Sequence, residues 1–201
     1  MSNRPMGGPG SASPHQFNIL DRALPKGKST VSLSAMTFLF REMIRYSQDR
    51  SGSVAELEGR LHALGEGVGR RLLEVVVWRD RGGRRETTLL GILALIQNTL
   101  WKALLGRPAA SLEKGLQATD EYMISDPSPP LTQFISPSKD VGHFTPASFL
   151  AGVVAGALQA AGFPGRVTAH LVAVEGQAAP RTTILIKFDA VVMDRDAQAS
   201  A

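Results

Sequence analysis

The 201-residue chain contains no cysteine, which excludes disulfides, thiolate metal ligands and acyl groups carried on a thiol. Aromatic residues are scarce as well, at 6%, whereas proteins that bind single-stranded nucleic acid need aromatic platforms for base stacking. The N-terminus lacks the apolar run of a signal peptide, so we do not expect secretion. The longest apolar run, residues 89–105, carries polar groups and is shorter than the roughly 20 residues of a membrane span.

The positive charge of the chain is concentrated near its N-terminus. The formal net charge is +4. Residues 1–30 hold four basic residues against one acidic residue, a net of +3, which leaves +1 for the remainder. A nucleic-acid-binding fold should carry its basic stripe on the folded body. We therefore expect no nucleic-acid partner.

Residue patterns typical of catalysis or metal binding are missing. The four histidines fall in four separate segments, without the spacing of a zinc site or a hydrolase triad. The carboxylates are scattered too, and no pair is placed for acid–base catalysis. We predict a protein that is not an enzyme and that has no metal or cofactor.

Turn and cap signals divide the chain into a tail and one domain. Residues 1–17 are rich in Gly, Ser and Pro and are predicted to be a disordered tail. Residues 18–201 are long enough for a single well-buried core. Within them, residues 18–24 could form a short helix, which Pro25 would end.

Four helices are predicted from apolar periodicity and capping residues. The first runs to about Asp49 after the Ser29–Ser32 cap region, and the second starts at a Ser53/Glu56 capping box. The third covers residues 89–105, with Glu86 and Thr87 as its start signal. The fourth has Thr145 as N-cap, Pro146 as its first residue and Gly162 at its end.

Extended segments complete the fold prediction. Residues 121–135 form short extended stretches broken by prolines, and residues 166–174 and 182–188 form a hairpin. We predict an α+β fold in which helices pack on one side of a small antiparallel sheet.

The first helix carries the candidate partner contacts. Its apolar residues, among them Leu33, Met36 and Met43, share one broad arc. Phe38 lies on the opposite side, among charged residues. A large apolar residue on a polar face is either a partner contact or is covered by the protein's own loops. We name Leu33, Met36, Phe38 and Met43 as the candidate interface.

The second helix combines an apolar repeat with three glycines. Apolar residues recur at spacings of four and three, at Leu57, Leu61, Leu64, Val68, Leu72 and Val75. Gly65, Gly67 and Gly69 interrupt this helix without a preceding strand, which argues against a phosphate-binding loop. They indicate the close approach of another backbone or of an apolar ligand. A stand-alone domain that binds a lipid or another apolar ligand is therefore the alternative function.

The densest positive region follows this helix. Arg79, Arg81, Arg84 and Arg85 form a candidate surface for an acidic partner or an anionic membrane. The alternative is a solvated surface that is partly paired with its own carboxylates.

Six motifs in register carry a resemblance to a known family. They are Val31–Ala35, Ser53–Leu57, Arg84–Thr87, Trp101–Leu104, Gly162–Pro164 with Val167–His170, and Ile186–Phe188. Together they resemble the small-subunit family of the transport protein particle (TRAPP), and within it the subunit-five group. The resemblance runs from about Asn18 to Asp196.

The resemblance implies a fold and a biological setting. The fold is a set of helices on a twisted four-stranded antiparallel sheet. The setting is a multisubunit tether, cytoplasmic and peripheral at the cis-Golgi and endoplasmic reticulum, that promotes nucleotide exchange on a Rab GTPase in ER-to-Golgi vesicle transport. The implied partners are subunits three and two, and any membrane contact is at most peripheral. In the related subunit three a cysteine carries an acyl chain, and this cysteine-free chain cannot share that attachment.

Overall fold

The computed structural model describes residues 30–199, except 117, 136–143 and 174–179 and the side chain of Arg81. The predicted tail at residues 1–17 and the predicted short helix at 18–24 lie outside the described residues.

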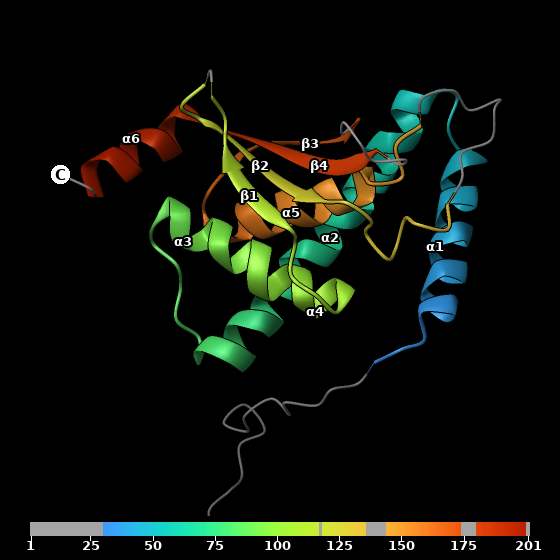
Figure 1. The fold of residues 1–201 in the computed structure, drawn as a ribbon, viewed down its shortest axis with the longest axis horizontal. Helices are drawn as coiled ribbons and strands as arrows, with labels where there is room; N and C mark the ends of the chain where they lie inside the picture. Colours follow the sequence, from blue (N-terminus) through green and yellow to red (C-terminus); the bar gives the residue numbers. More distant parts are fainter. Residues whose placement is uncertain (1–29, 117, 136–143, 174–179, 200–201) are drawn as a thin grey trace, which may run out of the picture.

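The chain folds as helices on one face of a four-stranded antiparallel sheet, which confirms the predicted fold class (Figure 1). The elements in chain order are α1 (Leu33–Gln48), α2 (Val54–Arg81), α3 (Leu89–Ala94), the π-helical segment η2 (Leu95–Leu100), α4 (Trp101–Leu105), β1 (Ser111–Lys114), β2 (Glu121–Asp126), α5 (Ser148–Ala161), β3 (Gly165–Val172), β4 (Arg181–Phe188) and α6 (Ala190–Ala199). The strand order is β1-β2-β4-β3, and all neighbours are antiparallel.

Strand alternation fixes which face of the sheet is buried. Ile184 pairs with Ile124 of β2, and both side chains are fully buried. Because side chains alternate along a strand, Ile186 and Phe188 point to the same side as Ile184, as predicted. Helix α5 covers this inner face.

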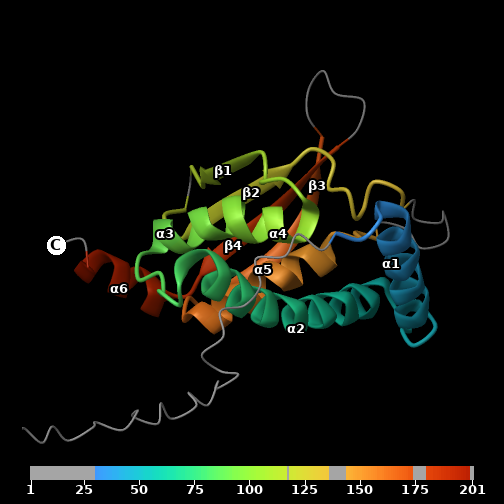
Figure 2. The ribbon, with the colours of Figure 1, turned by 90° about the horizontal axis from the view of Figure 1, so that it is seen from below.

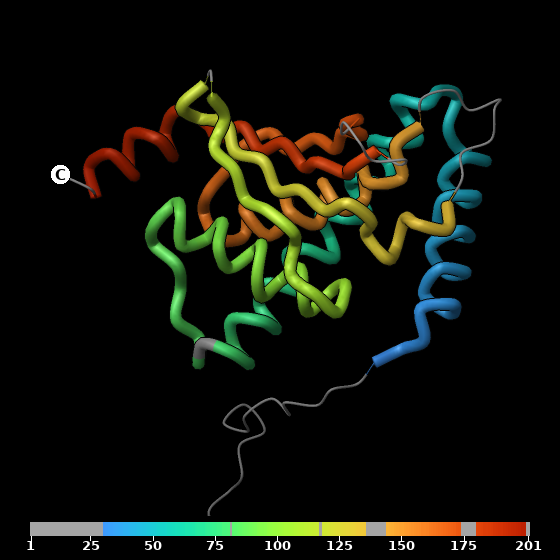
Figure 3. Tube along the Cα trace, viewed as in Figure 1, coloured from blue at the N-terminus to red at the C-terminus, as the bar shows by residue number. Residues whose placement is uncertain are grey.

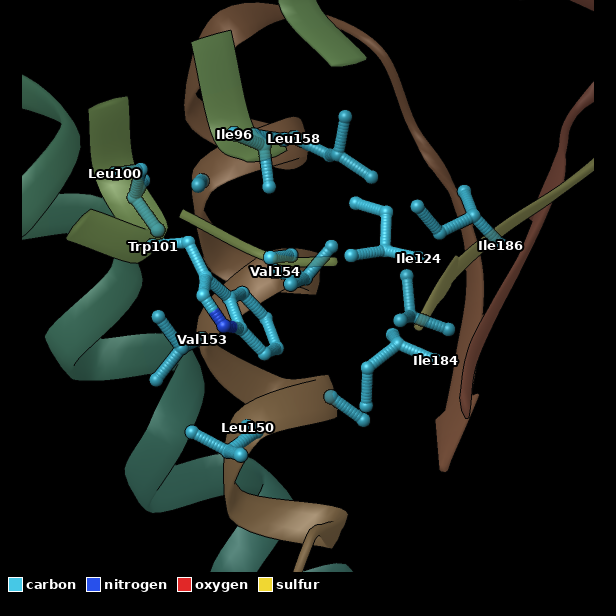
Figure 4. Close-up of a cluster of buried hydrophobic side chains, with 14 of the residues drawn as sticks. Ile96, Leu100, Trp101, Ile124, Leu150, Val153, Val154, Leu158, Ile184 and Ile186 are labelled. Carbon is cyan, nitrogen blue, oxygen red and sulfur yellow. The ribbon is translucent and has the colours of Figure 1, made fainter. Parts of the chain in front are cut away.

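The third predicted helix is a continuous run of α3, η2 and α4 and lies in the core. Its residues Ile96, Leu100 and Trp101 face α5 and the inner side of the sheet (Figure 4). The indole Nε1 of Trp101 donates a hydrogen bond of 3.0 Å to the buried carboxylate of Asp126. The helix is thus a core helix rather than a membrane span.

Helices α2 and α5 cross at two pairs of glycines. A Cβ atom on Gly65 or Gly69 would collide with a backbone carbonyl of α5. A Cβ atom on Gly152 or Gly156 would collide with a backbone carbonyl of α2. The prediction of close backbone approach is therefore correct for Gly65 and Gly69 and wrong for Gly67, which is approached only by the end of the Arg71 side chain. The α5 glycines thus meet α2 rather than the sheet.

Four details differ from the sequence prediction. Thr88, not Thr87, caps α3, because its hydroxyl accepts from the amide of Gly91. The helix predicted to start at Pro146 begins at Ser148, because Thr145–Ala147 form a turn first. Strand β1 was not predicted, and residues 121–135 contain a single strand. The C-terminal helix α6 was not predicted either.

Candidate partner-binding surface

Helix α1 stands at one end of the molecule, opposite α6, and has few neighbours (Figures 1 and 2). Its inner side is fixed by Phe40 and Ile44, which are buried, and the ring of Phe40 packs 5.4 Å from that of Phe149. On the outer side Phe38, Leu39 and Tyr46 are 66%, 56% and 60% exposed. We call these three residues the α1 face. Three large apolar side chains on one short helix are an unusual exposed cluster.

A second apolar row runs along α2. Leu64 and Val68, one turn apart, are exposed. Val75, two turns after Val68, is half-buried. We call these three residues the α2 row. Their spacings of four and seven keep them on one side of the helix. The side that faces α5 instead carries Gly65, Gly69, Leu73 and Val76. The apolar repeat predicted for this helix therefore points partly away from the protein's own core.

The four predicted interface residues are not equivalent in the structure. Phe38 is exposed and no loop among the described residues covers it. Leu33 is 41% exposed at the start of α1. Met36 and Met43 are half-buried and pack against the core. Phe38 is thus the most exposed member of the set, and Leu39 and Tyr46 are exposed neighbours that were not predicted as interface residues.

The predicted arginine surface is not one open patch. Arg85 donates a hydrogen bond of 3.3 Å to the carbonyl of Ala161, at the C-terminal end of α5. Arg79 is half-buried, and Arg84 is exposed. The side chain of Arg81 is not described. Of the other three predicted cations, Arg84 and Arg85 are on the surface, and Arg85 contacts the protein's own fold.

The C-terminal helix α6 joins α3 and α5 at the same end of the molecule. Arg195 donates to the carbonyl of Gly162 at 2.9 Å and lies 4.5 Å from the Phe163 ring centroid. Asp196 accepts from the amide of Leu89 at 3.1 Å, at the start of α3. These contacts complement the charges at the ends of two helices. They span long sequence separations, which explains why α6 was not predicted.

The described part of the molecule has concave regions, and two of them lie beside the helices discussed above. One, of about 230 Å³, is lined by Leu73, Trp78 and Ala160 and by residues of the 82–88 loop. This loop joins α2 to α3 (Figure 3). The other, of about 430 Å³, lies between the start of α1 and the end of α4. Neither includes Gly65 or Gly69, because the α5 backbone fills the space beside those glycines.

Within the described residues, no three metal-ligating side chains come together. No helix in that part of the chain has the length and hydropathy needed to cross a membrane.

Residues 36–189 match the family described as transport protein particle (TRAPP) component. The chain belongs to this family. The match runs from Met36, within α1, to just past the end of β4, so the α1 face, the α2 row and the glycine crossing all belong to the family domain.

Curated relatives agree with this assignment over most of the chain. "Trafficking protein particle complex subunit 5" of Dictyostelium discoideum is 51% identical over 180 residues, 90% of this chain and 97% of the relative. The human protein of the same name is 41% identical over 178 residues, 89% of this chain and 91% of the relative. Residues 30–201 number only 172, so at least eight of the residues matched to the Dictyostelium protein precede Thr30.

A solved structure supports the fold. The crystal structure of a trafficking protein particle complex subunit 3 from Naegleria fowleri, covalently bound to palmitic acid, matches with a TM-score of 0.63. It covers 78% of this chain and 95% of the other, at 18% identity. This likeness shows the shared fold alone.

Proposed function

We propose that this protein is a non-catalytic assembly subunit of the TRAPP complex, in which α1 and α2 bind a neighbouring subunit. The family membership supports a role in the complex. The observation that carries the assignment to this surface is the α1 face, where three large apolar side chains are more than half exposed. Leaving such side chains in water is unfavourable unless a partner covers them.

The proposed partners are subunits three and two, and the complex as a whole would act in ER-to-Golgi vesicle transport and in nucleotide exchange on a Rab GTPase. We further propose that the protein is cytoplasmic and peripheral at the cis-Golgi and endoplasmic reticulum. Arg84, which is exposed, is the cation best placed for an acidic partner or an anionic membrane surface. The names of the curated relatives support a role in the trafficking complex, and the finer assignments belong to the proposal.

The alternative of a stand-alone apolar-ligand domain has less support from the structure. Its motivating feature was the glycine-rich stretch of α2, and the α5 backbone occupies the space beside Gly65 and Gly69. The chain also has no cysteine to which an acyl chain could be attached.

Replacing Phe38 by Asp tests the proposed surface. A charge at the centre of an apolar interface must be desolvated without a partner, so we expect recovery of subunit three in a pull-down to fall at least about tenfold. The measurement is co-purification of the full chain with subunit three of the same organism, quantified by mass spectrometry.

Val191→Asp is the matched control, because Val191 is 72% exposed on α6 at the other end of the molecule. We expect this variant to recover subunit three as the unmodified chain does. Recovery of Phe38→Asp at the level of the control would contradict the assignment of the α1 face. Purification of the protein without any other TRAPP subunit would contradict the proposed function itself.

A further inference from the structure

The loop between α2 and α3 carries two adjacent arginines just before a threonine. Helix α2 ends at Gly82, which adopts a left-handed conformation with a φ of 59°, and the chain then runs along the periphery of the molecule to α3 (Figure 1). Residues 84–87 form neither helix nor strand. Because no regular hydrogen-bonding pattern holds this segment, it can fit the substrate groove of an enzyme that acts on the chain.

Thr87 and Thr88 are adjacent in this loop but have different roles. The Thr88 hydroxyl accepts a hydrogen bond of 3.2 Å from the amide of Gly91 and caps α3. The Thr87 side chain is exposed, and the cap does not use its hydroxyl. Thr87 therefore carries the hydroxyl of the pair that another molecule can reach without removing a helix cap.

The two arginines are both exposed to solvent. Arg84 and Arg85 stand three and two residues before Thr87. The guanidinium of Arg85 donates one long hydrogen bond, of 3.3 Å, from Nη2 to the carbonyl of Ala161. A guanidinium has five N–H donors in a planar fork, so a carboxylate of another molecule can still pair with this side chain.

The spacing of these residues is a recognition pattern. Two arginines three and two residues before a hydroxyl are read by basophilic protein kinases, whose carboxylates pair with the two guanidiniums. The chain has one other adjacent arginine pair, Arg70–Arg71, and two leucines follow it. Exposure, irregular backbone and arginine spacing therefore coincide at Thr87.

We propose that Thr87 is a phosphorylation site for a protein kinase that recognises arginines three and two residues before the acceptor. In this reaction the hydroxyl oxygen of Thr87 forms a bond to the γ-phosphorus of ATP. The bond between that phosphorus and the oxygen that bridges it to the β-phosphate breaks, and ADP leaves. The hydroxyl proton passes to a carboxylate of the kinase.

Phosphorylation reverses the charge of this loop. Arg84 and Arg85 against Glu86 give residues 84–87 a net charge of +1, two basic residues minus one acidic residue. A phosphate adds about −2, which brings the segment to about −1. Arg84 is the cation assigned above to an acidic partner or surface, so the phosphate weakens that attraction. This consequence rests on the proposed function, whereas the phosphorylation site itself does not.

Phosphorylation of the folded full-length chain tests the site. The chain is incubated with magnesium ATP and the catalytic subunit of the cyclic-AMP-dependent kinase, which reads arginines at these two positions, and mass spectrometry locates the phosphate. Thr87→Val keeps the branched shape and should lower the incorporated phosphate at least about tenfold. Thr88→Asn is the matched control, because Asn also caps a helix, and should leave incorporation unchanged. No phosphate on the unmodified chain, or equal incorporation in Thr87→Val, would overturn the proposal.

Two double variants test whether the arginines are recognised. Arg84→Gln with Arg85→Gln should lower kcat/KM of the kinase for the chain at least about 100-fold, because two charge-assisted contacts are lost. Arg70→Gln with Arg71→Gln removes the same charge from α2 and should change kcat/KM less than about threefold. Equal losses in the two variants would show general electrostatic attraction and overturn the proposal. Circular dichroism checks that each variant keeps its fold.

Use of the site in the cell has its own readout. The chain purified from its own organism in the presence of phosphatase inhibitors should carry phosphate on Thr87, which mass spectrometry detects. Absence of that phosphate would overturn the proposal. Neither the kinase assay nor this measurement requires another TRAPP subunit, so a negative result leaves the proposed function intact.

Discussion

Replacing Gly69 by Ala should lower the midpoint of thermal unfolding by about 10 °C. The added methyl group would collide with the carbonyl oxygen of Val153, and a backbone oxygen cannot rotate away as a side chain can. Relief requires α2 and α5 to move apart, which loosens the core along both helices. Overpacking of this kind costs about 3 kcal/mol, and a domain of this size loses roughly 2–4 °C per kcal/mol. Calorimetry or thermal circular dichroism of the purified chain measures the shift.

The same helix supplies matched controls. Gly59 lies in α2 with no atom within 4 Å of the position of an added Cβ. Gly59→Ala should therefore stabilise the protein by up to about 1 kcal/mol, the usual helix preference for Ala over Gly. Gly67 faces only the end of the Arg71 side chain at 3.4 Å, so Gly67→Ala should be near neutral or stabilising. If Gly69→Ala were as stable as Gly59→Ala, the close crossing of α2 and α5 would not exist as described.

Helix α2 shows which features can be predicted from the sequence and which cannot. Local cap chemistry was predictable: the Ser53 hydroxyl accepts from the Glu56 amide at 3.2 Å, and Glu56 accepts in return from Gly52 at 2.9 Å. The hydrogen bond from Gly52 and that from Arg60 both lower the pKa of Glu56. Such signals lie within four residues of each other, so the sequence contains the whole interaction.

The orientation of α2 was not predictable in the same way. Periodicity assigns the inner face to the apolar repeat, and that rule holds for helices that pack through side chains. Here α5 approaches so closely that glycines occupy the inner face and Leu64 and Val68 are displaced outward.

For the candidate site, Phe38 was identified by its polar neighbours on one helix. The contact of Arg85 with Ala161 joins residues 76 positions apart, which periodicity and spacing do not reveal.

Replacing Asp126 by Ala is expected to have the second large effect, a loss of about 3 kcal/mol in the free energy of unfolding. The Asp126 carboxylate is fully buried and accepts from Trp101 at 3.0 Å, from the Arg107 guanidinium at 2.7 Å and from the Ser128 amide at 3.0 Å. These hydrogen bonds thus connect α4 and the segment after it to the end of β2. Its removal leaves an indole N–H unpaired in the core and a cation without its counter-charge. The Arg107 side chain is 40% exposed, so water can solvate its charge in the variant and offset part of the lost free energy. The expected loss therefore lies at the lower end of the range for a broken buried ion pair.

Two further variants separate the charge of Asp126 from its hydrogen bonds. Asp126→Asn keeps an oxygen that accepts from Trp101 or Ser128 but loses the ionic attraction to Arg107, so we expect roughly half the loss. Asp194→Ala, at an exposed aspartate on α6, should change the free energy by less than about 0.5 kcal/mol. Urea denaturation of the three variants gives the comparison. A loss in Asp126→Ala no larger than in Asp194→Ala would mean that this buried network does not hold α4 against the sheet, and that apolar packing around Trp101 suffices.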